Sequence, residues 1–530
     1  MGHRIVLREV MSTYASRRPA WSIALSSARV AVPAGLGALV AISLLLRTTE
    51  LGIGFWIDEG LSVGIADRPL HEIPLALRED GSPPLYYMLL HFWLDIAGRS
   101  EAGVRGLSLL FALLAIPAAF WACRAIWGSA KAAWFGAVLM AFNPFLAQYA
   151  QEARMYSLVA LLAIPATACF LRAYALDTER RRPWIAGFAV SVAVALYTHN
   201  WPIFFAASAA VAWAVLWGLA DRPRRRELLR DGLLGFGGVL LLYLPWIPTT
   251  LYQAKHTGAP WADAPSLDSL LGVPGVLLGR MPQIVLLICA GAGLLVLLRR
   301  PLNERGRAVV CLAIIAVLTP ALAWLMSQAS PAWANRYLAV ALPPFLLLAA
   351  GGLTYARRLG YVGLVLVVIM WAQDAAPVEK SNVRAIAHNI APSLRPGDLV
   401  ISTQPETIPV LHYYLPAGLR YATLTGPQTE LGVWDWRDGV QRLDATTPEK
   451  DLKPVIDALA PGTRVVLVEP ITWTLNRWRA PWTKLIRIRS KEWSQYLSND
   501  AQLEVTAIQP TAFTPPRPNP VQATVMVKTG

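Results

Sequence analysis

Long runs without Asp, Glu, Lys or Arg alternate with polar connections over the first 373 residues. A helix that crosses a bilayer needs about 20 apolar residues, and most of these runs fall near that length. The run 183–220 is too long for one helix, and Tyr197-Thr-His-Asn-Trp-Pro202 divides it into a hairpin of two. The pattern predicts about eleven spanning helices, at 30–46, 106–123, 132–151, 155–171, 183–220 (two helices), 232–248, 281–298, 308–335, 337–356 and 359–373.

The remainder of the chain, 374–530, predicts a separate soluble domain of small α/β type. Asn382 to Leu394 has the period of an amphipathic helix. Asp398 to Ser402 and Arg464 to Glu469 are typical of short buried strands. Pro510 to Pro520 is rich in proline and is expected to be extended. We find no internal repeat. The predicted fold is thus an all-α polytopic membrane domain followed by a small C-terminal α/β domain.

The composition excludes an ordinary soluble protein. Of the 530 residues, 55% are hydrophobic and 15% are charged, whereas a soluble domain carries about 25% charged residues. The same figures exclude a disordered chain. All four cysteines lie inside apolar runs, so no disulfide framework and no cysteine metal site are expected. The first run ends at Arg47-Thr-Thr-Glu50 without a cleavage site of small residues, so we expect it to remain as an anchor.

The basic residues predict the orientation. The net charge is +14, and the arginine clusters fall in alternate connections, which the positive-inside rule assigns to the cytoplasm. These clusters are Arg17-Arg18, 180–182, 222–230, 299–307 and 357–358. The loop 48–104, the other connections and the tail 374–530 are therefore expected on the outer face of the cytoplasmic membrane. No basic cluster with stacking aromatics lies on a soluble face, so no nucleic-acid partner is expected.

Two carboxylates, Asp58 and Glu59, closely follow the first predicted span. A carboxylate beside the headgroups could serve as a general base for an acceptor hydroxyl there. The alternative is that Asp58 only caps a short helix that starts at Glu59. Asp80 lies further along the same loop, and a capping role is equally plausible for it. Pro83-Pro84 then predicts the start of a helix along the interface, where Tyr86 more simply belongs to an aromatic belt.

A very short outward turn between two spans holds Gln151, Glu152, Arg154 and Tyr156. Charged groups at the bilayer boundary are costly and by default mark function or pairing. We therefore favour a functional role for Glu152 and Arg154. The alternative is that the two side chains only neutralise each other.

Arg336 stands at the outer mouth of a late span. A planar guanidinium suits a phosphate group, although the residue could equally be a snorkelling anchor. Lys255, in the loop 249–280, could extend this cationic patch. His199 lies in another outward turn; a lone histidine is more often structural than catalytic, and we assign it no metal.

These motifs occur in one order that resembles the glycosyltransferase C superfamily, nearest to its branch of protein mannosyltransferases and aminoarabinose transferases. The resemblance covers roughly 30–356, and the soluble tail lies outside it. It rests on the Asp-Glu doublet, on Pro83-Pro84-Leu85-Tyr86-Tyr87, on Gln151-Glu152-Ala153-Arg154-Met155-Tyr156, and on Arg336-Tyr337 before Pro343-Pro344.

The resemblance implies transfer of a sugar from a polyprenyl-phosphate donor to an acceptor hydroxyl, with inversion at the anomeric carbon. Asp58 would be the general base, and Glu59 would orient the site or help to hold a metal. Arg154 and Arg336, with Lys255, would bind the donor phosphate. The substrate-binding residues would be Asp80, Tyr86, Gln151, Glu152, Tyr156 and His199.

One departure is that members of this group often carry Lys or His where this chain has Ser82, which weakens any inference about the sugar. No organic cofactor is expected. A divalent metal is compatible with some relatives, but no clear ligand set supports one. Lipid, polysaccharide and protein acceptors all remain open, and the tail could bind an acceptor polymer or merely cap the cavity. A transporter or flippase of a lipid-linked sugar is the alternative function, although it would predict repeats and interrupted helices at the midplane.

Overall fold

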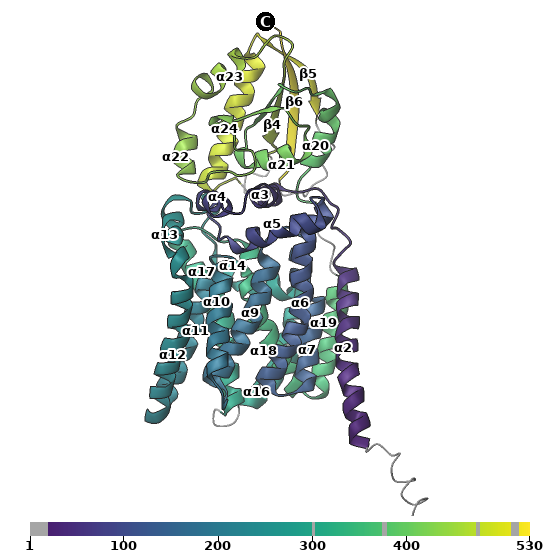
Figure 1. The fold of residues 1–530 in the computed structure, drawn as a ribbon, viewed down its shortest axis with the longest axis vertical. Coiled ribbons are helices and arrows are strands. Elements are labelled where there is room, and N and C mark those ends of the chain that lie inside the picture. Colours follow the sequence, from purple (N-terminus) through teal and green to yellow (C-terminus); the bar gives the residue numbers. More distant parts are fainter. Residues whose placement is uncertain (1–19, 299–302, 374–378, 473–477, 510–518, 530) are drawn as a thin grey trace, which may run out of the picture.

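The computed structural model describes residues 20–298, 303–373, 379–472, 478–509 and 519–529. A long helical bundle carries an α/β domain at one end, and a thin layer of short helices separates the two (Figure 1). The fold class predicted from the sequence is confirmed. The predicted domain boundary adjoins residues that lie outside the described part of the chain.

Each of the segments that we predicted to span the membrane contains at least one helix. Among the described residues, six helices are long and apolar enough to cross a bilayer, or seven if α7 and α8, bent by 54° at a break, are counted together. The count of eleven spans therefore stays a prediction. The bundle helices are α2 (Ala20–Leu46), α6 (Glu101–Trp127), α7 (Ala130–Phe142), α8 (Pro144–Ala150), α9 (Tyr156–Phe170), α10 (Arg182–Leu196), α11 (Pro202–Leu219), α12 (Arg222–Tyr243), α16 (Arg280–Leu298), α17 (Glu304–Ala329), α18 (Leu342–Tyr355) and α19 (Arg358–Ala372).

Several arginine-rich connections meet at the end of the bundle that lies away from the α/β domain. Arg307 pairs with Asp177 at 3.0 Å, and Arg181 pairs with Glu227 at 2.7 Å. The sequence places the arginine clusters in alternate connections, and the packing of the helices brings several of these connections together. Which end faces the cytoplasm remains a prediction.

The layer under the α/β domain consists of α3 (Ile57–Ala66), α4 (Ile73–Asp80), α5 (Leu85–Ala97) and α13 (Ile247–His256). Helix α5 begins directly after Pro84 and lies across the end of the bundle, as the proline pair predicted (Figure 1). The turn α14 (Leu267–Leu271), the helix α15 (Val273–Leu278) and the 3-10 helix η3 (Asn335–Val340) belong to the same outward connections.

The α/β domain is built on one six-stranded sheet of order β3-β2-β1-β4-β6-β5. Strand β1 pairs in parallel with β2 and β4, and the other pairs are antiparallel. The strands are β1 (Leu399–Ser402), β2 (Arg420–Thr423), β3 (Gly426–Gln428), β4 (Arg464–Pro470), β5 (Leu503–Gln509) and β6 (Val521–Lys528). The helices are α20 (Val383–Ile390), α21 (Ile408–Tyr414), α22 (Gly439–Asp444), α23 (Lys453–Asp457) and α24 (Pro481–Asn499).

The predicted strands β1 and β4 and the predicted amphipathic helix α20 are confirmed, while the remaining strands were not predicted. Most of the proline-rich segment, residues 510–518, lies outside the described residues.

Two glycines on one face of α3 let the α/β domain approach closely. A Cβ atom on Gly60 would lie 2.9 Å from the Cα of Val410, in α21. A Cβ on Gly64 would lie 2.2 Å from the carbonyl oxygen of Gly432. Residues four apart share one face of a helix, so any larger side chain at these positions would push the domain away. Helix α3 is therefore clamped between the bundle and the domain.

The orientation can be tested with single cysteines, because the four native cysteines are buried. We expect a membrane-impermeant maleimide to label Glu449→Cys, on the exposed surface of the α/β domain, in intact spheroplasts. Arg226→Cys, at the arginine-rich end, should react only after the membrane is permeabilised. The reverse pattern would contradict the predicted topology.

Candidate active site

Helix α3 begins at Ile57 and carries both carboxylates in its first turn, where the helix dipole favours negative charge. The alternative that Asp58 caps a helix starting at Glu59 is therefore wrong. Successive residues of a helix point in different directions, and the two side chains diverge accordingly. Asp58 lines a cavity between the bundle and the α/β domain, whereas Glu59 points into the protein.

Glu59 forms a bidentate ion pair with Arg105 of α6. Nε and Nη2 of Arg105 donate to the two carboxylate oxygens at 2.8 and 2.6 Å, and both side chains are only 1% exposed. The backbone N–H of Ala153 also donates to Glu59 at 2.8 Å. The pair thus joins α3, α6 and the turn before α9. Glu59 does not line the cavity, and the expectation that it orients the site stays a prediction.

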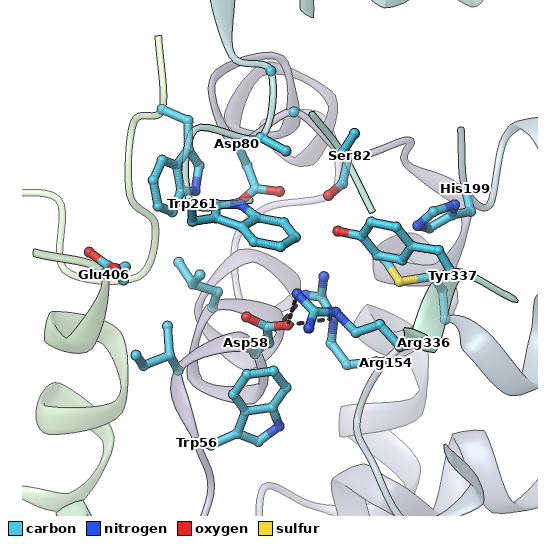
Figure 2. A pocket seen from close by; sticks show the side chains of 18 of the residues that line it. Trp56, Asp58, Asp80, Ser82, Arg154, His199, Trp261, Arg336, Tyr337 and Glu406 are labelled. Carbon is cyan, nitrogen blue, oxygen red and sulfur yellow. Dashed lines mark hydrogen bonds and ion pairs between the residues drawn. The ribbon is translucent and has the colours of Figure 1, made fainter. Parts of the chain in front are cut away.

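Asp58 faces two guanidinium groups across the cavity. Its Oδ2 lies 3.6 Å from Nη2 of Arg336 and 4.0 Å from Nε of Arg154 (Figure 2). These distances are typical of ion pairs and are too long for tight hydrogen bonds. Within the described residues, Oδ2 of Asp58 and the Nε atoms of both arginines are buried without a hydrogen-bond partner. Buried polar atoms without partners are rare, and a cluster of them marks a site that can receive a ligand.

Arg154 is fixed by the turn between α8 and α9. Its Nη1 donates to the carbonyl oxygen of Asp58 at 3.2 Å, to Ser62 at 3.1 Å and to Tyr87 at 3.2 Å. Burial opposes its charge, but the neighbouring tyrosines and carboxylates raise its pKa well above the ordinary value. Arg154 is therefore a permanent and rigidly held cation.

Arg336 is held by aromatic rings. Its guanidinium carbon lies 5.0 Å from the ring centre of Trp261, 5.3 Å from that of Tyr337 and 5.7 Å from that of Trp56. Cation–π contacts of this kind stabilise a charge without occupying its N–H donors. The guanidinium consequently stays available to an anionic ligand.

The cavity has a volume of about 560 Å³, which lies within the usual range for small-molecule sites, roughly 300–1,000 Å³. Asp80 and Ser82 form one side of it, and His199 lies near Tyr337 (Figure 2). Burial raises the pKa of Asp80 to about 6, against the opposing charge of Arg154. Burial, together with Arg154 and Arg336, lowers the pKa of His199 to about 3. His199 is thus a neutral hydrogen-bonding group at physiological pH.

Other predicted site residues lie outside the cavity lining. Gln151 accepts from the backbone N–H of Glu50 at 3.0 Å. The hydroxyl of Tyr86 forms a hydrogen bond of 2.9 Å with the hydroxyl of Ser108. This partner lies in the interior of the protein and not in the cavity lining. Tyr156 is buried, contacts His199 edge-on and Tyr337 at a tilt, and has a hydroxyl without a partner in the described residues.

The structure bears on the expectation for Lys255 and on the alternative interpretation of Glu152 and Arg154. Lys255 is exposed on α13 and does not line the cavity, because the helix turns Gln253 inward and Lys255 to the surface. The proposed mutual neutralisation of Glu152 and Arg154 is also wrong. The side chain of Glu152 instead forms an ion pair with Lys380.

Sequence reasoning missed the residues that the C-terminal part of the chain brings to the cavity. Lys380 reaches it from the connection before α20 and lies 4.3 Å from the ring centre of Trp56. The α/β domain adds a polar pair that follows β1, Gln404 and Glu406, together with indole rings. No motif marks these positions; only the tertiary fold brings them there. Among the described residues, no group of three or more His, Cys, Asp or Glu side chains could hold a metal ion.

Part of the sequence matches a known protein family, and the fold resembles several solved structures. The dolichyl-phosphate-mannose-protein mannosyltransferase family matches residues 81–259, about a third of the chain. No curated protein matches the sequence.

Two solved structures of ArnT from Cupriavidus metallidurans resemble the whole chain. The apo form is 15% identical with a TM-score of 0.61, and the form bound to undecaprenyl phosphate is 15% identical with a TM-score of 0.59. In both comparisons the match covers 93% of this chain and 98% of ArnT. AglB, an oligosaccharyltransferase from Archaeoglobus fulgidus, in complex with an inhibitory peptide and a dolichol-phosphate, is 12% identical with a TM-score of 0.54, over 83% of this chain and 70% of that one.

We predict that Arg105→Ala leaves Glu59 as a buried unpaired charge and destabilises the protein by about 3–5 kcal/mol. The measurement is the midpoint of thermal unfolding in detergent. Lys453→Ala, which breaks an exposed pair with Asp457, should leave the midpoint unchanged. Equal midpoints for wild type and Arg105→Ala would show that the buried pair does not hold α3 in place.

Proposed function

We propose that this member of the glycosyltransferase C superfamily, from its mannosyltransferase and ArnT-like branch, transfers a sugar from a polyprenyl-phosphate donor to an acceptor hydroxyl. The protein is a multi-pass membrane glycosyltransferase. We place its site on the outer face of the cytoplasmic membrane, following the arginine pattern. The observation that carries the assignment of residues is the meeting of Asp58, Arg154 and Arg336 in one cavity.

The two arginines are suited to the donor phosphate. The planar forks of the guanidinium groups match phosphate oxygens. Hydrogen bonds to Tyr87 and Ser62 hold Arg154 in place. Aromatic rings hold Arg336. Proteins of similar fold carry undecaprenyl phosphate and a dolichol-phosphate, which supports a lipid phosphate as the ligand here. Lys380, beside Trp56, adds a third cation to the same cavity.

Asp58 is the side chain best placed to act as general base. In the proposed reaction it takes the proton of the acceptor hydroxyl while that oxygen attacks the anomeric carbon. The bond from the anomeric carbon to the phosphate oxygen breaks, and its electron pair leaves with the polyprenyl phosphate. The guanidinium groups stabilise the negative charge that develops on this leaving group. Attack opposite the phosphate inverts the anomeric centre.

The remaining predicted residues take supporting roles in this proposal. Asp80 and His199 line the cavity and can hydrogen-bond the sugar. Gln151 holds the turn that carries Arg154 by accepting from Glu50, and Tyr156 lies against His199 and Tyr337 without lining the cavity. The polar site lies at one end of the bundle under the α/β domain, an arrangement that favours transfer over the alternative of lipid-linked sugar transport.

We expect Asp58→Asn to lower sugar transfer by about 10²–10⁴-fold, because the amide cannot accept the hydroxyl proton. The assay is turnover of radiolabelled polyprenyl-phosphate sugars prepared from host membranes, followed by thin-layer chromatography. Asp67→Asn, in the same loop and paired with Arg99 outside the cavity, should keep full activity. Full activity of Asp58→Asn would remove this residue as the base.

We also expect Arg336→Gln to weaken binding of undecaprenyl phosphate by about 10–100-fold, as loss of a charge-assisted contact does. Native mass spectrometry in nanodiscs measures this affinity. Lys255→Gln is the matched control, since that lysine is exposed outside the cavity and should have no effect. Equal losses in the two variants would indicate a general effect of positive charge and not a phosphate site at Arg336.

A further inference from the structure

The cavity has two walls of unlike chemistry. The wall formed by the bundle carries the guanidinium groups of Arg154 and Arg336. The wall formed by the α/β domain carries Glu406 and Gln404 with indole rings around them. Figure 2 shows Glu406 on the side away from Arg336, with Asp58 and Trp261 between them. A ligand that spans the cavity would therefore meet the two guanidinium groups and Asp58 at one end and Glu406 at the other.

Glu406 follows strand β1 through a 3-10 turn, η5 (Pro405–Thr407), and is only 5% exposed. Its Oε1 accepts hydrogen bonds from Nε2 of Gln404 at 3.1 Å and from Nε1 of Trp482 at 3.0 Å. Its Oε2 is buried and has no hydrogen-bond partner within the described residues. Burial raises the pKa of this carboxyl, and the negative charge of Asp58 adds to the effect.

A buried carboxylate oxygen without a partner is costly, and a ligand hydroxyl that donates to it would remove that cost. The same group repels a phosphate, so it would direct the anionic head of the donor toward the two arginines. The ligand expected on this wall is therefore rich in hydroxyl groups and carries no negative charge there.

The aromatic lining narrows the class of ligand. Trp436 and Trp478 of the α/β domain line the cavity together with Glu406 and Gln404, and Trp261, from the connection between α13 and α14, lines it as well. Flat apolar surfaces next to hydrogen-bonding groups suit a sugar ring, which has apolar faces and a polar edge. One mode of peptide binding adds the peptide as a strand to a sheet edge. The two edge strands here, β3 and β5, contribute no residue to the lining.

We propose that the wall formed by the α/β domain is the acceptor subsite and that it binds an uncharged carbohydrate ring, one of whose hydroxyl groups donates to Glu406. The ring so held would present a further hydroxyl toward Asp58. This inference rests on the proposed function, and it gives that function a class of acceptor. It also gives the C-terminal domain a role in recognition beyond covering the cavity.

Saturation-transfer NMR on the purified full-length protein in nanodiscs tests the subsite. The probes are methyl α-D-mannopyranoside, methyl α-D-glucopyranoside and methyl β-D-galactopyranoside, each with undecaprenyl phosphate present. We expect at least one glycoside to bind the wild type. Glu406→Gln, which preserves the shape of the side chain, should weaken that binding by about tenfold. Glu449→Gln, on the exposed surface of the same domain, should bind as the wild type does.

Trp436→Phe, in the α/β domain, provides a second variant if Glu406→Gln fails to fold, and it too should weaken glycoside binding. The proposal is overturned if no glycoside binds the wild type, if both variants bind as the wild type does, or if a serine-containing peptide binds in place of the glycosides. Binding of undecaprenyl phosphate is measured in parallel. Its absence in the wild type would count against the proposed function alone, while its retention in Glu406→Gln would separate acceptor recognition from donor recognition.

Discussion

The arrangement of the site depends on one carboxylate that is shared by two guanidinium groups. Asp58 lies within 4.0 Å of both Arg154 and Arg336, yet a single negative charge can balance only one of them. The site is therefore predisposed to accept a further anion. A phosphate bound there would compete with Asp58 for the arginines. Asp58 would then be released from one or both of the guanidinium groups that it now contacts.

The position of Asp58 is set by interactions that take no part in the chemistry. The next residue, Glu59, ties α3 to α6 through a buried ion pair, while Gly60 and Gly64 allow the α/β domain to pack on the outer face of the same helix. Short helices rarely hold a fixed position by themselves. Clamping α3 from both sides gives Asp58 a fixed place relative to Arg154, whose own turn hydrogen-bonds Glu59 through Ala153.

The sequence was sufficient to predict the helical segments and the meeting of Asp58 with Arg154 and Arg336. The alternation of apolar runs assigns the outward turns to one side of the membrane, and these three residues lie in such turns. It could not decide which way each side chain points. Glu59 points into the protein and Lys255 is exposed on α13, and neither residue lines the cavity. Glu406 could not be foreseen at all: its place depends on a sheet whose strands come from distant parts of the chain.

The most direct test of this account is a cryo-EM structure of the protein in nanodiscs with undecaprenyl phosphate. The account predicts the phosphate between the two guanidinium groups, within hydrogen-bond distance of both, with the Asp58 carboxylate released from at least one of them. Phosphate bound elsewhere, with Arg154 and Arg336 still closed on Asp58, would contradict it.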